Sequence, residues 1–224
     1  MILVLLDYFC KGMIGIANSI IRSDNNYIIG SFYGYNYYYI HFSDLNMVSS
    51  NFYLYKWIFY GSKLIKTKDG NFAFAGVVGD EYTKDIFVLK VDPAGNILWG
   101  KVMGALNNYS NQPVFDIKDF IETNDSGYVV LAEYKNCLVC SPRVIYVLVI
   151  KLDKSGNVSW YKVFKGASNY PQDIPYSIIQ TLDGGYAIAG ASTSGNGDVS
   201  IIKLNTSGNI MWDYLIGYSN RDEE

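Results

Sequence analysis

Carboxylate side chains are the groups in this sequence that could carry out acid–base chemistry. Cleavage of a glycosidic bond, for example, needs two carboxyl groups close together, one as proton donor and one as base or nucleophile. The candidates are Asp80, Glu81, Glu133 and Asp198, which are spread over different parts of the chain. Asp198, like Asp85, stands at the start of an expected strand, where an acidic side chain commonly caps a turn. The sequence alone therefore brings no pair of carboxylates together.

Motifs for nucleophilic, nucleotide-binding or zinc-protease chemistry do not occur in the sequence. There is no G-x-S-x-G, G-x-G-x-x-G, P-loop or H-E-x-x-H pattern, and the one histidine, His41, lies in the strand-like segment YYYIHF. The loop STSGNGD at 192–198 offers Asn196 and Asp198 to a calcium ion but lacks the alternating acidic ligands of a dedicated site. We therefore predict no catalytic residue, no metal and no cofactor, with calcium as the one option left open.

The three cysteines also leave their chemistry open. Cys137 and Cys140 form a C-x-x-C pair, which fits two ordinary thiols, a local disulfide or half of a zinc site. A complete zinc site needs four ligands, and Cys10 and His41 are the only other soft side chains in the sequence.

Composition and charge limit the possible partners. The chain is 50% hydrophobic and 17% charged, which indicates a folded protein, and its 21 Tyr and 11 Phe favour strands. A formal net charge of −3 gives no reason to expect nucleic acid as a partner. No stretch reaches the roughly 18 apolar residues of a membrane-spanning helix, and the start of the given chain lacks the basic n-region of a signal peptide. The low charge, with N-x-S/T sequons at Asn108, Asn124, Asn157 and Asn205, is more typical of a secreted or cell-surface protein than of a cytosolic one.

One line of sequence occurs three times and reveals an internal repeat. It reads KVDPAGNILW at 90–99, KLDKSGNVSW at 151–160 and KLNTSGNIMW at 203–212. In each copy a tryptophan follows four residues after a glycine, which gives the pairs Gly95 with Trp99, Gly156 with Trp160, and Gly208 with Trp212. Trp57 occupies the matching place in a degenerate first copy, MVSSNFYLYKW, which has no Gly-Asn pair.

A second signature precedes each of these lines and predicts another turn. Asp69, Asp125 and Asp183 each lie three residues before an aromatic residue, in KDGNF, NDSGY and LDGGY. Gly and Asn tolerate positive φ, so both signatures read as hairpin turns between apolar strands. We expect the Asp side chains to bond nearby backbone N–H groups inside the turn. Two hairpins per copy make four antiparallel strands.

Tandem four-stranded sheets that are apolar on both faces predict an all-β fold, a β-propeller of about four blades. The repeated tryptophans are then large plates that pack between neighbouring blades. The N-terminal segment resembles the last strand of a blade whose other strands are absent. It is either a fifth, outer strand on the final blade, or the sign of a ring that is cut from a longer propeller or completed by a partner. The expected segments are an orphan outer strand at 1–12, blades at 13–60, 61–104, 114–166 and 172–217, and a tail at 218–224.

The repeats resemble known propeller families in layout. LDGGYAIAG followed by DVSIIKLNTSGNIMW resembles kelch-like propellers and, more closely, the tandem repeats of bacterial and archaeal surface propellers, over most of residues 61–217. The line KVDPAGNILW is also similar to the tryptophan-docking repeat of quinoprotein dehydrogenases, and KSGNVSW to the Asp-box of sialidases. In both cases the Asp-to-Gly spacing departs from the family pattern, and the motif is structural in the family, so the resemblance places no catalytic residue.

The most unusual segment is aromatic and lies in the first blade. The segment SFYGYNYYYIHF at 31–42 is followed by further aromatic residues up to Tyr60. Aromatic faces bind sugar rings and peptide side chains well, although alternating Tyr in a strand also packs without any ligand. The candidate ligand contacts are Tyr35, Tyr37, Tyr39, Tyr53 and Tyr55.

Since no catalytic constellation appears, the leading hypothesis is a non-enzymatic propeller that binds a protein or glycan. The alternatives are a propeller enzyme of glycoside-hydrolase or quinoprotein type, and a purely structural subunit that self-associates.

Overall fold

All the regular structure in the described part of the chain is β-strand, and it belongs to two compact units, residues 1–103 and residues 104–224, which are described separately. The computed structural model describes residues 15–23, 26–33, 37–44, 49–55, 58–79, 84–93, 96–103, 114–135, 145–165, 173–192 and 198–217. Within these ranges there is no helix, and none is therefore long or apolar enough to cross a membrane.

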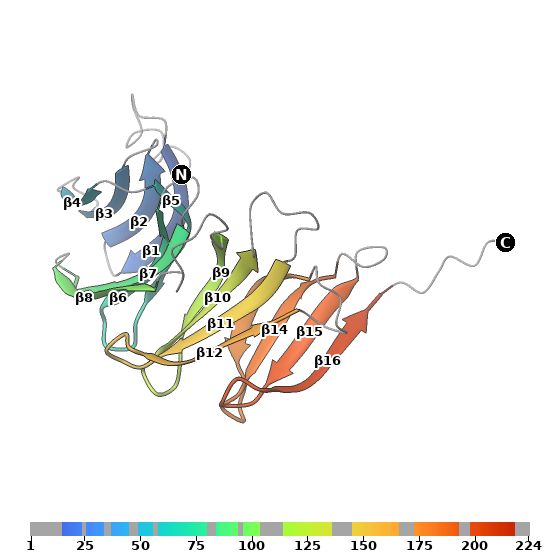
Figure 1. Ribbon diagram of the computed structural model, residues 1–224. Helices are drawn as coiled ribbons and strands as arrows, with labels where there is room; N and C mark the ends of the chain where they lie inside the picture. Colours follow the sequence, from blue (N-terminus) through green and yellow to red (C-terminus); the bar gives the residue numbers. More distant parts are fainter. Residues whose placement is uncertain are drawn as a thin grey trace. The chain divides into compact units, whose positions relative to one another are not determined.

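The first unit contains two four-stranded antiparallel sheets (Figure 1). One sheet consists of β1 (Gly15–Ser23), β2 (Asn26–Tyr33), β3 (Tyr37–Asp44) and β4 (Ser49–Tyr55). The other consists of β5 (Ile58–Lys66), β6 (Phe72–Gly79), β7 (Lys84–Val91) and β8 (Ile97–Met103). In both, the strands follow one another across the sheet in sequence order.

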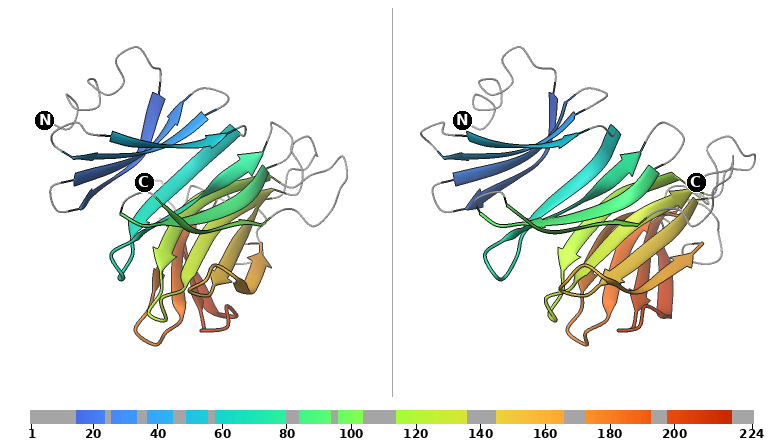
Figure 2. Two further views of the ribbon diagram at one scale, coloured as in Figure 1. Left: turned by 90° about the vertical axis from the view of Figure 1, so that its left-hand side faces the viewer. Right: turned by 60° about the vertical axis from the view of Figure 1, so that its left-hand side comes forward.

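The second unit contains two more sheets of the same design, which Figure 2 shows from two further directions. The first consists of β9 (Val114–Glu122), β10 (Tyr128–Lys135), β11 (Ile145–Leu152) and β12 (Val158–Phe164). The second consists of β13 (Ile174–Gln180), β14 (Tyr186–Ala191), β15 (Val199–Leu204) and β16 (Ile210–Ile216). The prediction of an all-β fold built from four-stranded antiparallel sheets is confirmed. One boundary differs from the sequence assignment: β5 begins at Ile58, because Ile58 to Tyr60 pair with β6, so these residues belong to the second sheet rather than to the first blade at 13–60.

Repeated turns close the hairpins of the second unit. In the turn before β14, Gly184 has φ +81°, and in the turn before β16, Gly208 has φ +76°. This left-handed backbone conformation strains residues that carry a Cβ. The turn before β10 uses Ser126 at φ +60° instead of glycine.

A shared apolar core joins the two sheets of the second unit. Buried side chains of β10 and β11 pack against those of β13, β14 and β15, and the cluster comprises Val129, Leu131, Val147, Val149, Ile178, Tyr186, Ile188, Ile202 and Leu204. A buried polar contact fixes the same seam. The Asp119 carboxylate on β9 accepts hydrogen bonds from the Ser177 hydroxyl (2.9 Å) and the Ile178 N–H (3.0 Å) on β13.

A β-bulge precedes each of the three repeated tryptophans that the structure describes. The strand register shifts between Lys151 and Leu152, whose partners are Trp160 and Val158, so Ser159 is the extra residue. The same shift occurs before Trp99 and Trp212. A bulge re-aims the side chain that follows it, and Trp160 is aimed at the neighbouring sheet, where its ring lies 5.8 Å from that of Tyr186 at an interplanar angle of 66°.

Gly208 provides the space for this tryptophan. A Cβ on Gly208 would lie 2.6 Å from the Trp160 ring, closer than real Cβ contacts allow. The glycine of one sheet and the tryptophan of the sheet before it are therefore a matched pair.

We expect Gly208→Ala to destabilise the second unit more than Gly184→Ala does. Both substitutions put a Cβ at a positive φ, at a cost of about 1 kcal/mol, but at Gly184 the nearest atom to the Cβ is a Thr206 methyl group at 3.3 Å. Gly208→Ala should cost about 2 kcal/mol more, because the Trp160 ring must move out of a packed position. Urea unfolding of the two variants measures the difference.

The control for this prediction repeats both glycine substitutions in a chain that carries Trp160→Ala. In that background the additional cost of Gly208→Ala should disappear, since the ring that the new Cβ would meet is gone. An equal loss in the free energy of unfolding for the two glycine substitutions in the parent chain would show that Trp160 does not pack against Gly208.

Candidate functional site

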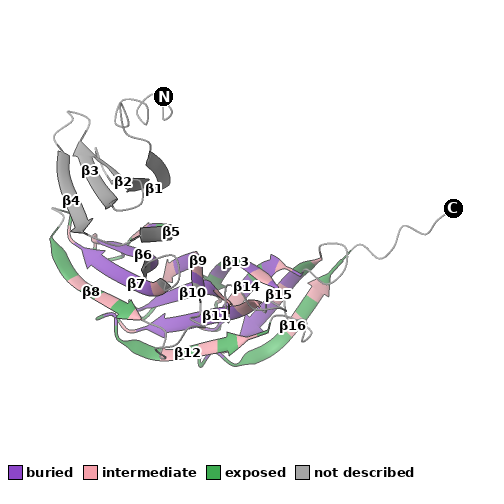
Figure 3. Cartoon of the chain, turned by 45° about the horizontal axis from the view of Figure 1, so that its top comes forward, coloured by how far each residue is buried: buried purple, intermediate pink, exposed green. Residues whose placement is uncertain are grey.

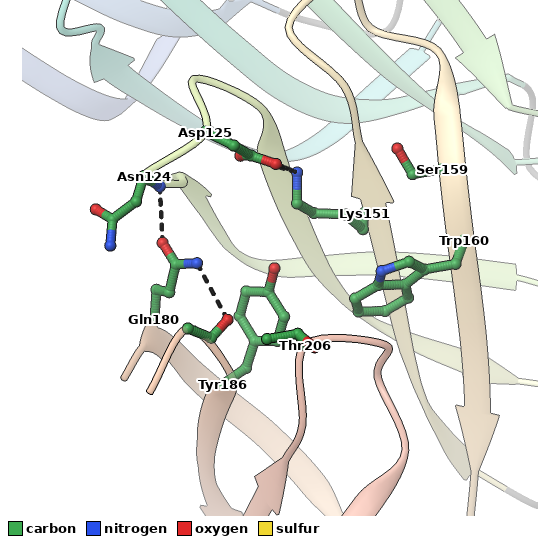
Figure 4. Close-up of a pocket in the computed structure, with 9 residues that line it drawn as sticks. Asn124, Asp125, Lys151, Ser159, Trp160, Gln180, Tyr186 and Thr206 are labelled. Atoms are coloured by element: carbon green, nitrogen blue, oxygen red, sulfur yellow. Dashed lines mark hydrogen bonds and ion pairs between the residues drawn. The ribbon is translucent and has the colours of Figure 1, made fainter. Parts of the chain in front are cut away.

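A pocket of about 360 Å³ opens at the seam between the two sheets of the second unit, beside the hairpin turns. Figure 4 shows that side chains from both sheets converge on it. The sheet β9–β12 contributes Asn124, Asp125, Lys151, Ser159 and Trp160, and the sheet β13–β16 contributes Gln180, Gly184, Tyr186 and Thr206.

The Asp125 carboxylate is held in place by its own turn and by the next hairpin. It accepts hydrogen bonds from the Lys151 ammonium group at 2.8 and 3.1 Å, from the Gly127 N–H at 3.1 Å and from the Thr123 hydroxyl. Burial alone would raise the pKa of Asp125, but the hydrogen bonds from Lys151, Thr123 and Gly127 outweigh it and lower the pKa to about 2. Asp125 therefore stays ionised near neutral pH and cannot serve there as a proton donor.

The Lys151 ammonium group is buried and its donors are directed to protein acceptors. Besides the two Asp125 oxygens, the Leu152 carbonyl accepts a hydrogen bond from Nζ at 2.9 Å. An ammonium group has three N–H donors, so these three contacts use all of its hydrogen-bonding capacity. The pair adds no net charge to the pocket, while the outer side of Asp125 remains exposed.

Gln180 connects the turns of the two sheets. Its side-chain carbonyl accepts a hydrogen bond from the Asn124 N–H at 2.8 Å, and its amide nitrogen donates to the Gly184 carbonyl at 3.2 Å. Figure 4 shows both bonds as one bridge along the pocket wall. This bridge fixes the two turns relative to each other, which gives the pocket a defined width.

Two aromatic side chains form the apolar part of the pocket. Trp160 and Tyr186 meet edge to face, an arrangement that aromatic rings prefer. Burial, together with the negative charge of Asp125, raises the pKa of Tyr186 to about 12. The Tyr186 hydroxyl therefore stays protonated and can act as a hydrogen-bond donor.

The pocket offers groups that could hold a polar ligand. It combines the Trp160 ring with a fixed carboxylate acceptor, a neutral phenol and the polar side chains of Asn124, Thr206 and Ser159. The Asp125 pKa lies far below neutrality, and general acid catalysis needs a pKa nearer the working pH. Proton donation is therefore not a role for Asp125 near neutral pH.

The other predicted turn aspartates have the same local surroundings. Asp183 accepts hydrogen bonds from Lys203 (2.8 and 3.0 Å), the Thr181 hydroxyl and the Gly185 N–H, and these lower its pKa well below the usual range. Asp69 in the first unit likewise pairs with Lys90 at 2.6 Å. Sequence reasoning missed the lysine partners Lys90, Lys151 and Lys203, although a lysine is the first residue in all three copies of the repeated line.

The remaining predicted residues are distributed as follows. Gly156 has φ +79° in the turn between β11 and β12, and Trp212 on β16 is 42% exposed. The backbone register pairs Tyr37 with Tyr55 and Tyr39 with Tyr53. The side chains of these four tyrosines lie outside the described residues, as do Tyr35, Trp57, Gly95, Cys137, Cys140, the segment 1–12 and the tail at 218–224.

The carboxylates considered for acid–base catalysis are not brought together. Glu133 lies at the end of β10 that is remote from the pocket, and its two oxygens accept from Lys118 and Lys135, each at 2.8 Å. Asp198 directly precedes β15, and Asp80, Glu81 and Asn196 lie outside the described residues. Among the residues that the structure does describe, no group of three or more His, Cys, Asp or Glu side chains could hold a metal ion.

Comparison with known proteins shows the fold. A mannose phosphorylase from Leishmania mexicana, solved in complex with phosphate ion, matches with a TM-score of 0.51 and 12% sequence identity over 89% of this chain and 71% of its own. A GH43 glycoside hydrolase whose active site was engineered to give both endo-xylanase and exo-arabinofuranosidase activity matches with a TM-score of 0.49 and 11% identity, over 89% of this chain and 39% of its own. An α-L-arabinofuranosidase from Clostridium thermocellum matches with a TM-score of 0.46 and 14% identity, over 91% and 72%. No family model matches the sequence, and no curated protein does so either.

The comparison supports a propeller-type fold of four-stranded antiparallel sheets and corrects one prediction. The hypothesis of a non-enzymatic binding module is contradicted by the match at a TM-score of 0.51, which is to an enzyme, a mannose phosphorylase. At 12% identity the likeness shows the fold and not the activity. The kelch-like character of the repeats stays a prediction.

The lowered pKa of Asp125 predicts an acid-sensitive contribution to stability. The unfolded-state pKa of an aspartate is about 3.9, so the stabilisation from Asp125 is fully present well above pH 4 and is lost as the pH falls through the folded-state value of about 2. Asp125→Asn should be less stable than the parent at pH 7, and its free energy of unfolding should fall less steeply between pH 4 and pH 2. Urea unfolding at stepped pH measures both slopes, and identical slopes would contradict the prediction.

Proposed function

We propose that this chain is a carbohydrate-active propeller enzyme of the glycoside hydrolase or phosphorylase kind, and that the seam pocket binds one sugar unit of its substrate. The observation that carries the proposal is the joint presence, in one pocket, of the partly exposed Trp160 ring and a rigid set of hydrogen-bonding groups around Asp125.

Sugar recognition needs this combination of surfaces. The C–H faces of a pyranose or furanose ring pack on aromatic side chains, while its hydroxyl groups need donors and acceptors in fixed positions. Trp160 provides the aromatic surface, the ionised Asp125 accepts from hydroxyl groups, and the hydroxyl group of Tyr186, whose ring is buried, donates. A hydrogen bond to a charged group contributes more than one between neutral groups, so Asp125 is the main polar anchor in this proposal.

Size and charge favour a neutral monosaccharide unit. The pocket volume of about 360 Å³ is near the lower end of small-molecule sites, which span roughly 300–1,000 Å³. Because Lys151 neutralises Asp125, a charged ligand gains no net electrostatic attraction in this pocket. A uronic acid or a sugar phosphate should therefore bind no better here than the neutral sugar.

The reaction class rests on fold analogy, which supports it only as a proposal. The fold likeness that supports it is to the mannose phosphorylase solved with phosphate ion. Glycosidic cleavage needs a proton-donating carboxyl group, and the Asp125 pKa of about 2 excludes it from that role. The proposal therefore assigns substrate binding to the seam pocket and proton donation to a carboxyl group outside it.

The test compares binding by Asp125→Asn with binding by Asp183→Asn. Asp183 has the same contacts to a threonine, a lysine and a turn N–H, but it does not line the pocket. The chain is titrated with a panel of neutral mono- and disaccharides, and binding is measured by tryptophan fluorescence and by calorimetry. The parent chain should bind at least one of these sugars. Asp125→Asn should weaken it about 10- to 100-fold, the loss expected for a hydrogen bond to a charged group, and Asp183→Asn should leave it unchanged.

Tyr186→Phe separates the hydroxyl group from the ring. It should weaken sugar binding by about threefold to tenfold, as expected for loss of one hydrogen bond between neutral groups, without changing the stacking surface. Turnover is then measured on aryl mannosides and arabinofuranosides with and without inorganic phosphate. A folded chain that binds no sugar in the panel, or equal losses in Asp125→Asn and Asp183→Asn, would overturn the pocket assignment. Sugar binding without turnover of any glycoside would overturn the enzyme assignment.

A further inference from the structure

The residue in the β-bulge before each tryptophan determines how much space remains beside the lysine–aspartate pair of its sheet. In β12 this residue is Ser159, and in β16 it is Met211, at the same place in the strand register. Both residues are exposed and lie on an edge strand of their sheets, and Figure 3 shows the exposed positions along these two strands. The two sheets therefore compare a small and a large side chain in one structural position.

Met211 shows where a long side chain in the bulge lies. Its sulfur atom is 4.0 Å from Nζ of Lys203. Lys203 pairs with Asp183 at 2.8 Å, just as Lys151 pairs with Asp125 at 2.8 Å in the sheet before. The methionine side chain thus extends to the lysine–aspartate pair and occupies the space beside it.

Ser159 leaves the equivalent space beside Lys151 open. This space belongs to the seam pocket, because Ser159, Lys151 and Asp125 all line it. Figure 4 shows Ser159 near Trp160, with its hydroxyl group directed to the side where Lys151 and Asp125 lie. A methionine side chain is longer than a serine side chain by a sulfur atom and a methyl group. The room that Ser159 leaves is therefore about the size of a hydroxymethyl group, which consists of a carbon and an oxygen atom.

The surroundings of this space suit a primary hydroxyl group. Asp125 is ionised and its side chain is 63% exposed, so a carboxylate oxygen can accept a hydrogen bond from the ligand. The Ser159 hydroxyl can donate or accept, whereas Lys151 directs its donors to Asp125 and the Leu152 carbonyl. Trp160, the next residue along β12, offers its ring to the apolar face of the same sugar.

We propose that the seam pocket selects hexoses over pentoses, because the space that Ser159 leaves beside Asp125 takes the hydroxymethyl group that a pentopyranose lacks. This inference rests on the proposed function, since it requires that the pocket binds a sugar unit. It names a hexopyranose as the substrate class and Ser159 as the residue that determines specificity. A pentose would leave Asp125 without this hydrogen-bond donor, and a site built to bind a hydroxyl group discriminates against the analogue that lacks it.

The test uses pairs of methyl pyranosides that differ only in the hydroxymethyl group. The pairs are D-glucoside with D-xyloside, D-mannoside with D-lyxoside, and D-galactoside with L-arabinoside, and calorimetric titration gives the Kd of each. In at least one pair the parent chain should bind the hexoside about 10- to 100-fold more tightly than the pentoside, as expected for one hydrogen bond to a charged group.

Two substitutions at Ser159 separate the space from the hydroxyl group. Ser159→Met fills the space, so the Kd of the hexoside should rise to about that of the pentoside, while the Kd of the pentoside stays nearly unchanged. Ser159→Ala keeps the space and the contact with Asp125, so the hexoside should still bind at least about threefold more tightly than the pentoside.

The matched control is Met211→Ser, the reverse exchange in a bulge that does not line the pocket, and it should leave both Kd values unchanged. Ser159→Met should fold normally, because β16 carries a methionine in the same position, and urea unfolding checks this directly.

The possible failures are distinguishable. Equal binding of hexosides and pentosides by the parent chain would overturn the inference and leave the proposed function in place. A hexoside preference that persists in a folded Ser159→Met chain, or that Ser159→Ala abolishes as completely as Ser159→Met does, would show that the space beside Asp125 does not set the specificity. A parent chain that binds neither member of any pair would overturn the proposed function and this inference with it.

Discussion

The seam of the second unit depends on a steric match between an indole ring and a missing Cβ. Trp160 can lie flat against the next sheet only because Gly208 leaves the space open, and the hairpin turn at Gly208 needs a positive φ that glycine adopts without strain. One residue thus satisfies two constraints, the turn of its own hairpin and the packing of the neighbouring sheet. This coupling explains why a glycine and a tryptophan recur together in the repeated line, since each tryptophan needs the glycine of the next sheet.

Buried polar groups complete the seam and make it specific. Asp119 is almost fully buried, yet it accepts hydrogen bonds from a hydroxyl and two backbone N–H groups, including the Ile178 N–H of the neighbouring sheet. An unsatisfied carboxylate at this depth would be strongly destabilising. A shifted alignment of the two sheets would leave this carboxylate without its partners on β13, so the contact selects one alignment where apolar packing alone would tolerate several.

Sequence patterns predicted the fold well because the constraints that create it are local. The spacing of Gly156 and Trp160, and of Asp125 and Tyr128, is set within one hairpin, so it can be read from the letters. The residues that form the pocket could not be predicted from local spacing in the sequence. Gln180 and Asn124 are 56 residues apart and meet only because two sheets pack side by side. The functional prediction was wrong because it relied on the aromatic first sheet and on the lack of catalytic motifs, and neither reports which side chains a seam brings together.

The pocket arises where the repeat varies rather than where it is constant. The pair of Asp125 and Lys151 is the constant part, since Asp183 and Lys203 have the same geometry in the next sheet. The bulged residue before the tryptophan is Ser159 here, but it is Leu98 or Met211 in the other sheets. Gln180, which bridges the turns, corresponds to Lys66 and Glu122 in the other copies. The shared frame tolerates variation at these positions, because neither Ser159 nor Gln180 fills the core. A repeat fold can therefore acquire a binding site at one seam without weakening the contacts that hold its sheets together.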